Sequence, residues 1–258
     1  MKMKLSALLT ATLLALGASA ANAVEFMDAK GDDNGPGTYV YPTDGVYKPG
    51  SFDITRFAAT KNGDQVEFAV DVNSSLEDPW GMGGGFAVQM AFIFIKNKDG
   101  GHTETPSLNA VFAKGSEWNN LVILSPQKKA RVVGEAQQKF PALVADIVVP
   151  NATRGNNRTI KGSVPLSELG GDGNVDGWGY QVVMQSNEGF PAATDLLTRK
   201  VNEYEGQHRF GGGNDGDCDP HIVDILESTA AKQADQLAYT CGPNGESVKR
   251  ATLQMIKK

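Results

Sequence analysis

The chain has 258 residues, of which 40% are hydrophobic and 21% charged, and this composition excludes a disordered or fibrous protein. Its 24 basic and 30 acidic side chains leave a net charge of −6, which argues against nucleic acid as a partner. With only three histidines and two cysteines, multi-histidine metal catalysis and a disulfide-rich scaffold are excluded as well.

The first 23 residues have the pattern of a secretory signal peptide. Lys2 and Lys4 precede an apolar run over residues 8–16, and Ala21-Asn22-Ala23 matches a small-residue cleavage site. The apolar run is too short for a transmembrane helix, which needs about 20 apolar residues. We therefore expect cleavage after Ala23 and a periplasmic or secreted product that does not span a membrane.

Strand patterns dominate the chain after an extended, turn-rich segment over residues 24–50. The predicted strands span residues 52–59, 65–72, 86–95, 109–113, 119–124, 130–134, 143–149, 158–165 and 179–185. Residues 61–64 join the first two strands as a hairpin. Helical periodicity is confined to residues 222–226 and 229–237.

The strongest strand pattern, over residues 86–95, is apolar on both faces. A strand of this kind is typical of the centre of a sheet that is covered on both sides. No linker, internal repeat or low-complexity block divides residues 24–258. We predict a single all-β domain, an antiparallel β-sandwich with a short C-terminal helical segment.

The cysteine pair consists of Cys218 and Cys241. An exported protein meets an oxidising compartment, which favours a disulfide between them. A redox-active pair or a zinc site is disfavoured, because C-x-x-C spacing is absent and two thiolates alone bind zinc poorly.

Two acidic, glycine-rich clusters are candidates for calcium binding. The candidate ligands are Asp32 and Asp33 in the N-terminal segment, and Asp215, Asp217 and Asp219 after a triple glycine. Alternating carboxylates in a tight turn can converge on one hard cation, although the glutamate that closes an EF-hand loop is missing. The alternative is that these aspartates only form turns, and for the related segment 172–177 we favour that alternative.

A catalytic site is not recognisable in the sequence. The G-x-S-x-G motif, the P-loop and the dinucleotide fingerprint are all absent, and each of the three histidines lies in turn-rich sequence. The plentiful carboxylates form no pattern that singles out an acid and a nucleophile for glycoside hydrolysis. We therefore expect a protein that is not an enzyme.

Aromatic side chains offer a different function, since flat rings can stack on the apolar faces of sugars. The candidate ligand-binding rings are Trp80, Trp118, Tyr39 and Tyr41. The alternative for any one of them is that it fills an end of the sandwich core. Met90 would be an axial ligand if the protein bound haem, but a methionine in so apolar a strand is more typical of plain core.

Several blocks of sequence resemble one known family in their order along the chain. They are residues 31–44 (GDDNGPGTYVYPTD), 49–54 (PGSFDI), 79–81 (PWG), 85–89 (GFAVQ), 210–213 (FGGG) and 219–226 (DPHIVDIL). With these blocks the chain resembles the C-terminal domain of glucodextranase, which also ends amylopullulanases. The resemblance extends from about residue 28 to residue 240.

This resemblance implies a DOMON-like β-sandwich and a non-catalytic module that binds carbohydrate or holds enzymes at the cell surface. The expected partner is therefore an extracellular carbohydrate or surface polymer, with calcium as a candidate stabilising ion. Relatives of the DOMON fold include haem-b subunits of periplasmic oxidoreductases. A haem-binding electron-transfer subunit is thus the alternative function, and haem is a cofactor only under that alternative.

Overall fold

The computed structural model describes residues 22–258, so the predicted signal peptide lies outside the described residues except for Asn22 and Ala23. The strands are β1 (Ala23–Met27), β2 (Ile54–Asn62), β3 (Gln65–Val72), β4 (Gln89–Lys96), β5 (Ala110–Phe112), β6 (Asn120–Leu124), β7 (Ile147–Val148), β8 (Thr153–Asn156), β9 (Thr159–Pro165), β10 (Gly179–Ser186), β11 (Asp224–Ile225), β12 (Thr240–Cys241), β13 (Ser247–Lys249) and β14 (Ala251–Leu253). The helices are α1 (Lys129–Lys139), the 3-10 helix η1 (Val144–Asp146), α2 (Leu166–Leu169) and α3 (Ala230–Leu237).

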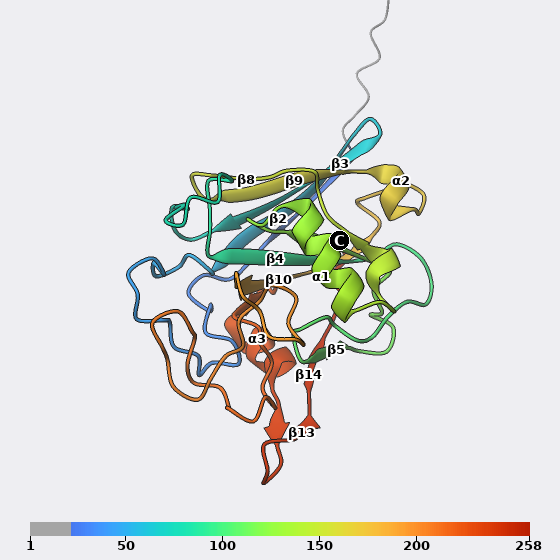
Figure 1. The fold of residues 1–258 in the computed structure, drawn as a ribbon. Coiled ribbons are helices and arrows are strands. Elements are labelled where there is room, and N and C mark those ends of the chain that lie inside the picture. The colour runs from blue at the N-terminus through green and yellow to red at the C-terminus, as the bar shows by residue number, and fades with distance from the viewer. Residues whose placement is uncertain (1–21) are drawn as a thin grey trace, which may run out of the picture.

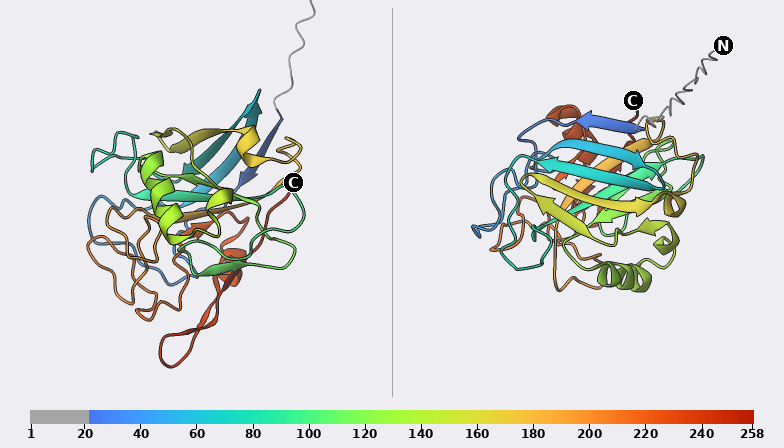
Figure 2. Two further views of the ribbon diagram at one scale, coloured as in Figure 1. Left: turned by 45° about the vertical axis from the view of Figure 1, so that its right-hand side comes forward. Right: turned by 90° about the horizontal axis from the view of Figure 1, so that it is seen from above.

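Two five-stranded sheets form the body of the molecule, with the orders β1-β2-β3-β9-β8 and β11-β10-β4-β6-β7. Neighbouring strands run antiparallel, except for the parallel pair β6 and β7. The sheets lie face to face (Figures 1 and 2), and side chains from both share one apolar core. The predicted all-β sandwich is therefore confirmed.

Strand β4 lies in the middle of the second sheet and is buried on both of its faces. One face, with Ala91, Ile93 and Ile95, contributes to the core between the sheets. The other face, with Met90, Phe92 and Phe94, contributes to a second core that α1, α3 and the β5–β14 pair cover. The prediction that this strand is central and covered on both sides is thus confirmed.

The hairpin expected at residues 61–64 joins β2 to β3. Asn62 lies opposite Gln65, so the loop consists of only Gly63 and Asp64. Gly63 has a φ of +63°, a conformation that glycine adopts without steric cost. The turn residues of the sequence therefore fix the register of these two strands.

The strand predicted over residues 130–134 is wrong, because this segment belongs to helix α1. Its two adjacent valines favour a strand locally, but the pattern continues as Val132 and Ala136, which lie four residues apart and are both buried. A helix places such a pair on one face, and α1 uses that face to cover the second core. Tertiary packing therefore overrides the local β preference.

The segment 222–226 also differs from its prediction, since it contains strand β11 where a helical pattern was expected. The segment is apolar and too short for its periodicity to distinguish a strand from a helix. Strand β11 pairs with β10 at the edge of the second sheet. The helix expected over residues 229–237 is confirmed as α3, whose first turn is capped by the Thr229 side chain.

Three long loops gather at one end of the sandwich (Figure 1), and we call this region the loop end. They comprise residues 28–53, 73–88 and 187–223, and they contact one another directly. Val40 pairs with Gly211, and the Thr43 amide donates to the Gly206 carbonyl at 3.0 Å. The candidate site residues lie mostly on these loops.

A disulfide joins Cys218 to Cys241, with their Cα atoms 5.4 Å apart, as the sequence predicts. The bridge links the third loop to the hairpin that β12 and β13 form. Among the residues that the structure describes, no helix has both the length and the apolar character needed to cross a bilayer.

Candidate functional site

Trp80 is the one tryptophan of the three that is exposed, with 37% of its surface accessible. Its loop is held by the Asp78 carboxylate, which accepts hydrogen bonds from the Met82 and Gly83 amides, each at 2.7 Å. Side chains of this kind mimic a backbone turn and order a loop locally. The ring is therefore presented on an ordered segment.

The far end of this loop is anchored on strand β8. The Gly155 amide donates to the Gly84 carbonyl at 2.7 Å. Gly85 has a φ of +82°, and a Cβ there would lie 2.3 Å from the Gly155 carbonyl oxygen. Glycine is required at this position, because the two backbones approach too closely for any side chain.

Two aromatic neighbours and several polar groups surround Trp80. Its ring lies 6.5 Å from that of Tyr47 and 6.2 Å from that of His208, in edge-to-face arrangements. The His208 imidazole is half-exposed and lies 4.0 Å from the Asp44 carboxylate. We call this group of four residues, Trp80, Tyr47, His208 and Asp44, the Trp80 face. An exposed ring beside hydrogen-bonding groups is suited to a flat, hydroxylated ligand.

Tyr39 and Tyr41 do not belong to this exposed face, and the burial of Tyr39 corrects the prediction that its ring stacks on a ligand. Tyr39 is buried, and its hydroxyl donates to the Pro220 carbonyl. Tyr41 is half-buried, and its hydroxyl donates to Asp33. A tyrosine hydroxyl that is removed from water needs a hydrogen-bond partner. The bond of Tyr39 joins the first loop to the third, and that of Tyr41 lies within the first loop.

Trp118 is fully buried, so it cannot form part of a binding platform, and this prediction is also corrected. Its ring packs in the second core 5.5 Å from the ring of Phe94. Its indole nitrogen donates to the Glu104 carbonyl at 2.9 Å. A position just before a strand is compatible with core or surface, and here burial of a large apolar ring prevails.

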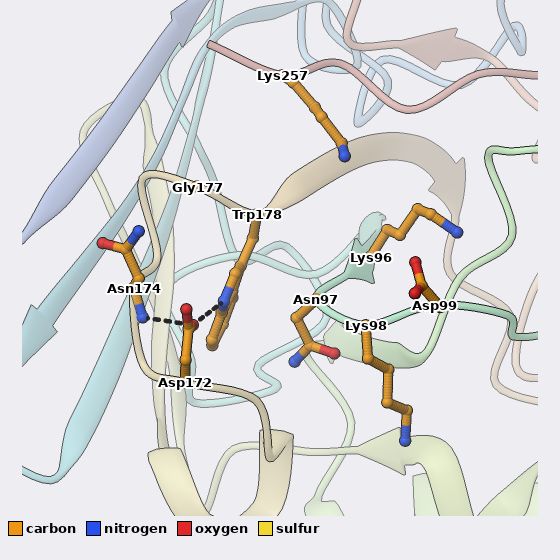
Figure 3. A pocket seen from close by; sticks show the side chains of 9 residues that line it. All are labelled: Lys96, Asn97, Lys98, Asp99, Asp172, Asn174, Gly177, Trp178 and Lys257. Atoms are coloured by element: carbon orange, nitrogen blue, oxygen red, sulfur yellow. Dashed lines mark hydrogen bonds between the residues drawn. The ribbon is translucent and has the colours of Figure 1, made fainter.

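Trp178 borders a separate polar hollow of about 240 Å³ (Figure 3). The hollow is lined by Lys96, Asn97, Lys98, Asp99, Asp172, Asn174, Gly177, Trp178 and Lys257. Asp172 accepts hydrogen bonds from the Asn174 amide and the Trp178 indole nitrogen, at 2.9 and 3.1 Å. The turn-forming role favoured for residues 172–177 is thus confirmed. Only 3% of Trp178 is exposed, so its ring face is not available for stacking.

The aspartates predicted to bind calcium near the disulfide serve different partners. Asp215 accepts from the Glu203 amide at 2.9 Å, and Asp217 forms an ion pair with Lys200. Asp219 is fully buried and accepts from the Asn214 amide at 3.2 Å. The structure therefore does not bring these three carboxylates together around one point.

The N-terminal aspartates behave differently. Asp33 binds the Tyr41 hydroxyl, but one oxygen of Asp32 comes together with oxygens of Asp28 and Asp224. Burial and the neighbouring carboxylates raise the pKa of Asp28 to about 9 and that of Asp32 to about 6. Burial also raises the pKa of Asp224 well above its usual range. This cluster is the place where the described residues could hold a metal ion.

Asp224 is the member of this cluster that the sequence-based prediction missed. It is the first residue of strand β11 and lies within the apolar run Ile222–Leu226. Its surface is completely buried. A charged residue inside a buried apolar strand is rare unless it is paired or binds a metal. That mismatch between residue type and surroundings was the signal available in the sequence.

Met90 and the histidines were the other residues considered for haem binding or catalysis. Met90, the residue considered for haem ligation, is fully buried in the second core. His221 is buried, and its Nδ1 accepts a hydrogen bond from the Val201 amide at 3.3 Å. Burial lowers the pKa of His221 to about 4, so its imidazole is neutral at neutral pH. His102 lies 2.7 Å from Asp146.

Comparison with known proteins gives one clear relationship. No curated protein matches the chain. A family model described as the C-terminal binding-module, SLH-like, of glucodextranase matches residues 23–255. The match includes both sheets, the loop end and the disulfide, which is more than half of the chain. The chain therefore belongs to the family of SLH-like C-terminal binding modules of glucodextranase.

Proposed function

We propose that the chain is a non-catalytic module that binds an extracellular glycan or cell-surface polymer through the Trp80 face. Its membership in a family of binding modules supports a binding role. The observation that carries the proposal is the exposure of Trp80 on an ordered loop, while Trp118 and Trp178 are buried. Such a protein acts outside the cytoplasm, in the periplasm or after secretion.

The chemistry of the Trp80 face suits a sugar ligand. An indole ring offers a flat apolar surface, and a pyranose offers axial C–H groups to pack against it. His208, Asp44 and Gln207 provide hydrogen-bonding groups beside the ring, with Gln207 Nε2 3.3 Å from Asp44 Oδ2. Because the loop is ordered before binding, little conformational entropy is lost when a ligand is bound.

Calcium has a supporting role in this proposal. An ion near the N-terminal aspartates would fix the loops of the loop end without touching the ligand. Asp33, which follows the cluster residue Asp32, binds Tyr41, and Tyr41 packs 5.0 Å from Phe210 in the core of the loop end. A fixed loop end keeps Trp80 in place.

The test is retention of the purified chain on a panel of insoluble polysaccharides and cell-wall polymers. We expect the wild type to be retained on at least one polymer, and Trp80→Ala to abolish that retention. Trp80→Phe, which keeps a flat ring, should retain partial binding. Because Trp80 is partly exposed and lies outside both cores, Trp80→Ala should lower the melting temperature much less than Trp118→Ala does.

The control is Val248→Ala, which removes an exposed apolar side chain on strand β13. This variant should bind like the wild type. Equal retention of Trp80→Ala and wild type would contradict the assignment of the site to Trp80. Failure of the wild type to bind any member of a broad panel would contradict glycan binding itself.

A further inference from the structure

Three aspartates from distant parts of the chain meet where an edge of each sheet approaches the loop end, and a fourth lies beside the first loop. Asp28 follows the edge strand β1, Asp32 lies in the first loop, Asp53 precedes β2, and Asp224 lies in the edge strand β11. One oxygen from each of Asp28, Asp32 and Asp224 lies within 4.8 Å of the other two. Asp53 accepts a hydrogen bond from the Gly31 amide, next to Asp32 in sequence, at 2.8 Å. Burial raises the pKa of Asp32, and the negative charge of Asp53 raises it further.

All four carboxylates are withdrawn from water. The exposed fractions are 9% for Asp28, 2% for Asp32, 1% for Asp53 and 0% for Asp224. An isolated carboxylate is very costly to bury, so it is expected to be paired, protonated or bound to a metal. Among the described residues, no lysine, arginine or histidine forms an ion pair with any of the four.

Hydrogen bonds compensate for the burial of some of these carboxylate oxygens but not of others. Asp224 accepts from the Ile54 and Ile225 amides, at 2.6 and 2.9 Å, and one oxygen of Asp28 accepts from the Glu227 amide. Within residues 22–258, however, both oxygens of Asp32 and one oxygen of Asp28 have no hydrogen-bond partner. Buried polar atoms in native proteins are rarely left so. The free oxygens of Asp32 therefore point to a ligand at the centre of the cluster.

The donor set identifies the class of that ligand. The three converging groups are all carboxylates, and hard cations such as calcium and magnesium prefer oxygen ligands, whereas zinc prefers nitrogen and sulfur. Oxygens that lie within 4.8 Å of one another can share one cation. Calcium takes six to eight oxygen ligands in a flexible geometry, whereas magnesium usually keeps several waters and only one or two carboxylates. A buried set of three carboxylates therefore fits a calcium ion better than a magnesium ion.

We propose that Asp28, Asp32 and Asp224 bind one calcium ion, with the Asp53 carboxylate beside it. The ion offsets two of the buried negative charges and gives the free oxygens of Asp32 a partner. It also joins the edge strand β1 of one sheet to the edge strand β11 of the other, so it cross-links the sandwich where the first loop begins.

A series of packed side chains connects the neighbourhood of the metal site to the Trp80 face. Asp33 accepts from Tyr41, whose ring packs against Phe210 at 5.0 Å. Phe210 packs against Tyr47 at 6.3 Å, and Tyr47 against Trp80 at 6.5 Å. Loss of calcium should therefore weaken glycan retention as well as stability. This last expectation rests on the proposed function, whereas the metal site does not.

The experiment uses the full mature chain, stripped of metal with a chelator and dialysed, with calcium chloride as the probe. Calorimetric titration should give one bound calcium per chain. The melting temperature should rise with the logarithm of the calcium concentration, by roughly 5–10 °C at a hundredfold excess over Kd. Magnesium at the same concentration should give a smaller rise.

The decisive variant is Asp32→Asn, since an amide matches the carboxylate in shape and removes one buried charge. Without calcium it should melt at or above the temperature of the stripped wild type, because repulsion is relieved. With calcium it should gain little, and its affinity should fall at least tenfold. The matched control Asp215→Asn alters the other predicted acidic cluster and should keep the full calcium response.

Two results would overturn the proposal. One is a stripped wild type whose melting temperature ignores calcium, which would mean that the cluster is neutralised by protons. The other is a calcium response in Asp32→Asn equal to that of the wild type. Glycan retention is measured separately in both states, so failure of the ligand assay leaves the calcium result intact.

Discussion

The disulfide between Cys218 and Cys241 should stabilise the chain mainly by restricting its unfolded state. The bridged residues are 23 positions apart, and closing a loop of that length corresponds to about 3 kcal/mol at 25 °C on the chain-entropy model. In the folded state the bridged loop has other supports. Asn109 Nδ2 donates to the carbonyls of Asp217 and Asp219, at 3.0 and 2.8 Å. Breaking the bridge should therefore leave the fold in place.

The assay is urea unfolding of the oxidised wild type, the reduced wild type and the Cys218→Ala/Cys241→Ala double variant. The last two should each lose about 3 kcal/mol, which corresponds to a drop of roughly 6–12 °C in melting temperature. The urea dependence should be steeper without the bridge, because the unfolded chain exposes more surface. A loss below about 1 kcal/mol on reduction would refute this reasoning, since the entropic term alone exceeds it.

Three further predictions concern single residues. Trp118→Ala should cost about 3–5 kcal/mol of unfolding free energy in urea, because the ring is fully buried. A variant as stable as the wild type would contradict the burial of this ring. Gly85→Ala should cost about 1–3 kcal/mol, since its φ is +82° and a Cβ would meet the Gly155 carbonyl; an unchanged urea midpoint would contradict this. The pKa of His221 is about 4 in the folded state and higher in the unfolded state, so the unfolded chain binds a proton more readily. Between pH 6.5 and 4 the wild type should therefore lose up to about 3 kcal/mol more unfolding free energy than His221→Asn.

The strands of the sandwich could be predicted where local pattern and tertiary environment agree. Strand β3 occupies the predicted residues 65–72, and β4 is apolar on both faces because two cores meet it. The prediction failed over residues 130–134, where the β-branched pair is part of a helix. It also failed over residues 222–226, where a helix was expected and a strand is found, because a five-residue apolar segment has no distinctive period.

The candidate site was only partly predictable, because exposure and convergence are properties of the folded chain. Trp80 and Trp118 both lie in loops or near strand ends, yet one is exposed and the other is fully buried. Asp32 could be identified from its acidic, glycine-rich surroundings. The sequence did not indicate that Asp224 is a neighbour of Asp32. The two residues come together only in the folded chain, where β11 pairs with β10.

Tryptophan fluorescence tests most directly whether Trp80 contacts the ligand. Trp118 and Trp178 are buried, so a ligand at the Trp80 face should change the emission of Trp80 alone. We predict that a polymer which retains the chain shifts the wild-type emission to shorter wavelength and leaves the spectrum of Trp80→Phe unchanged. The same shift in Trp80→Phe, or tight binding by the wild type with no spectral change, would contradict the claim.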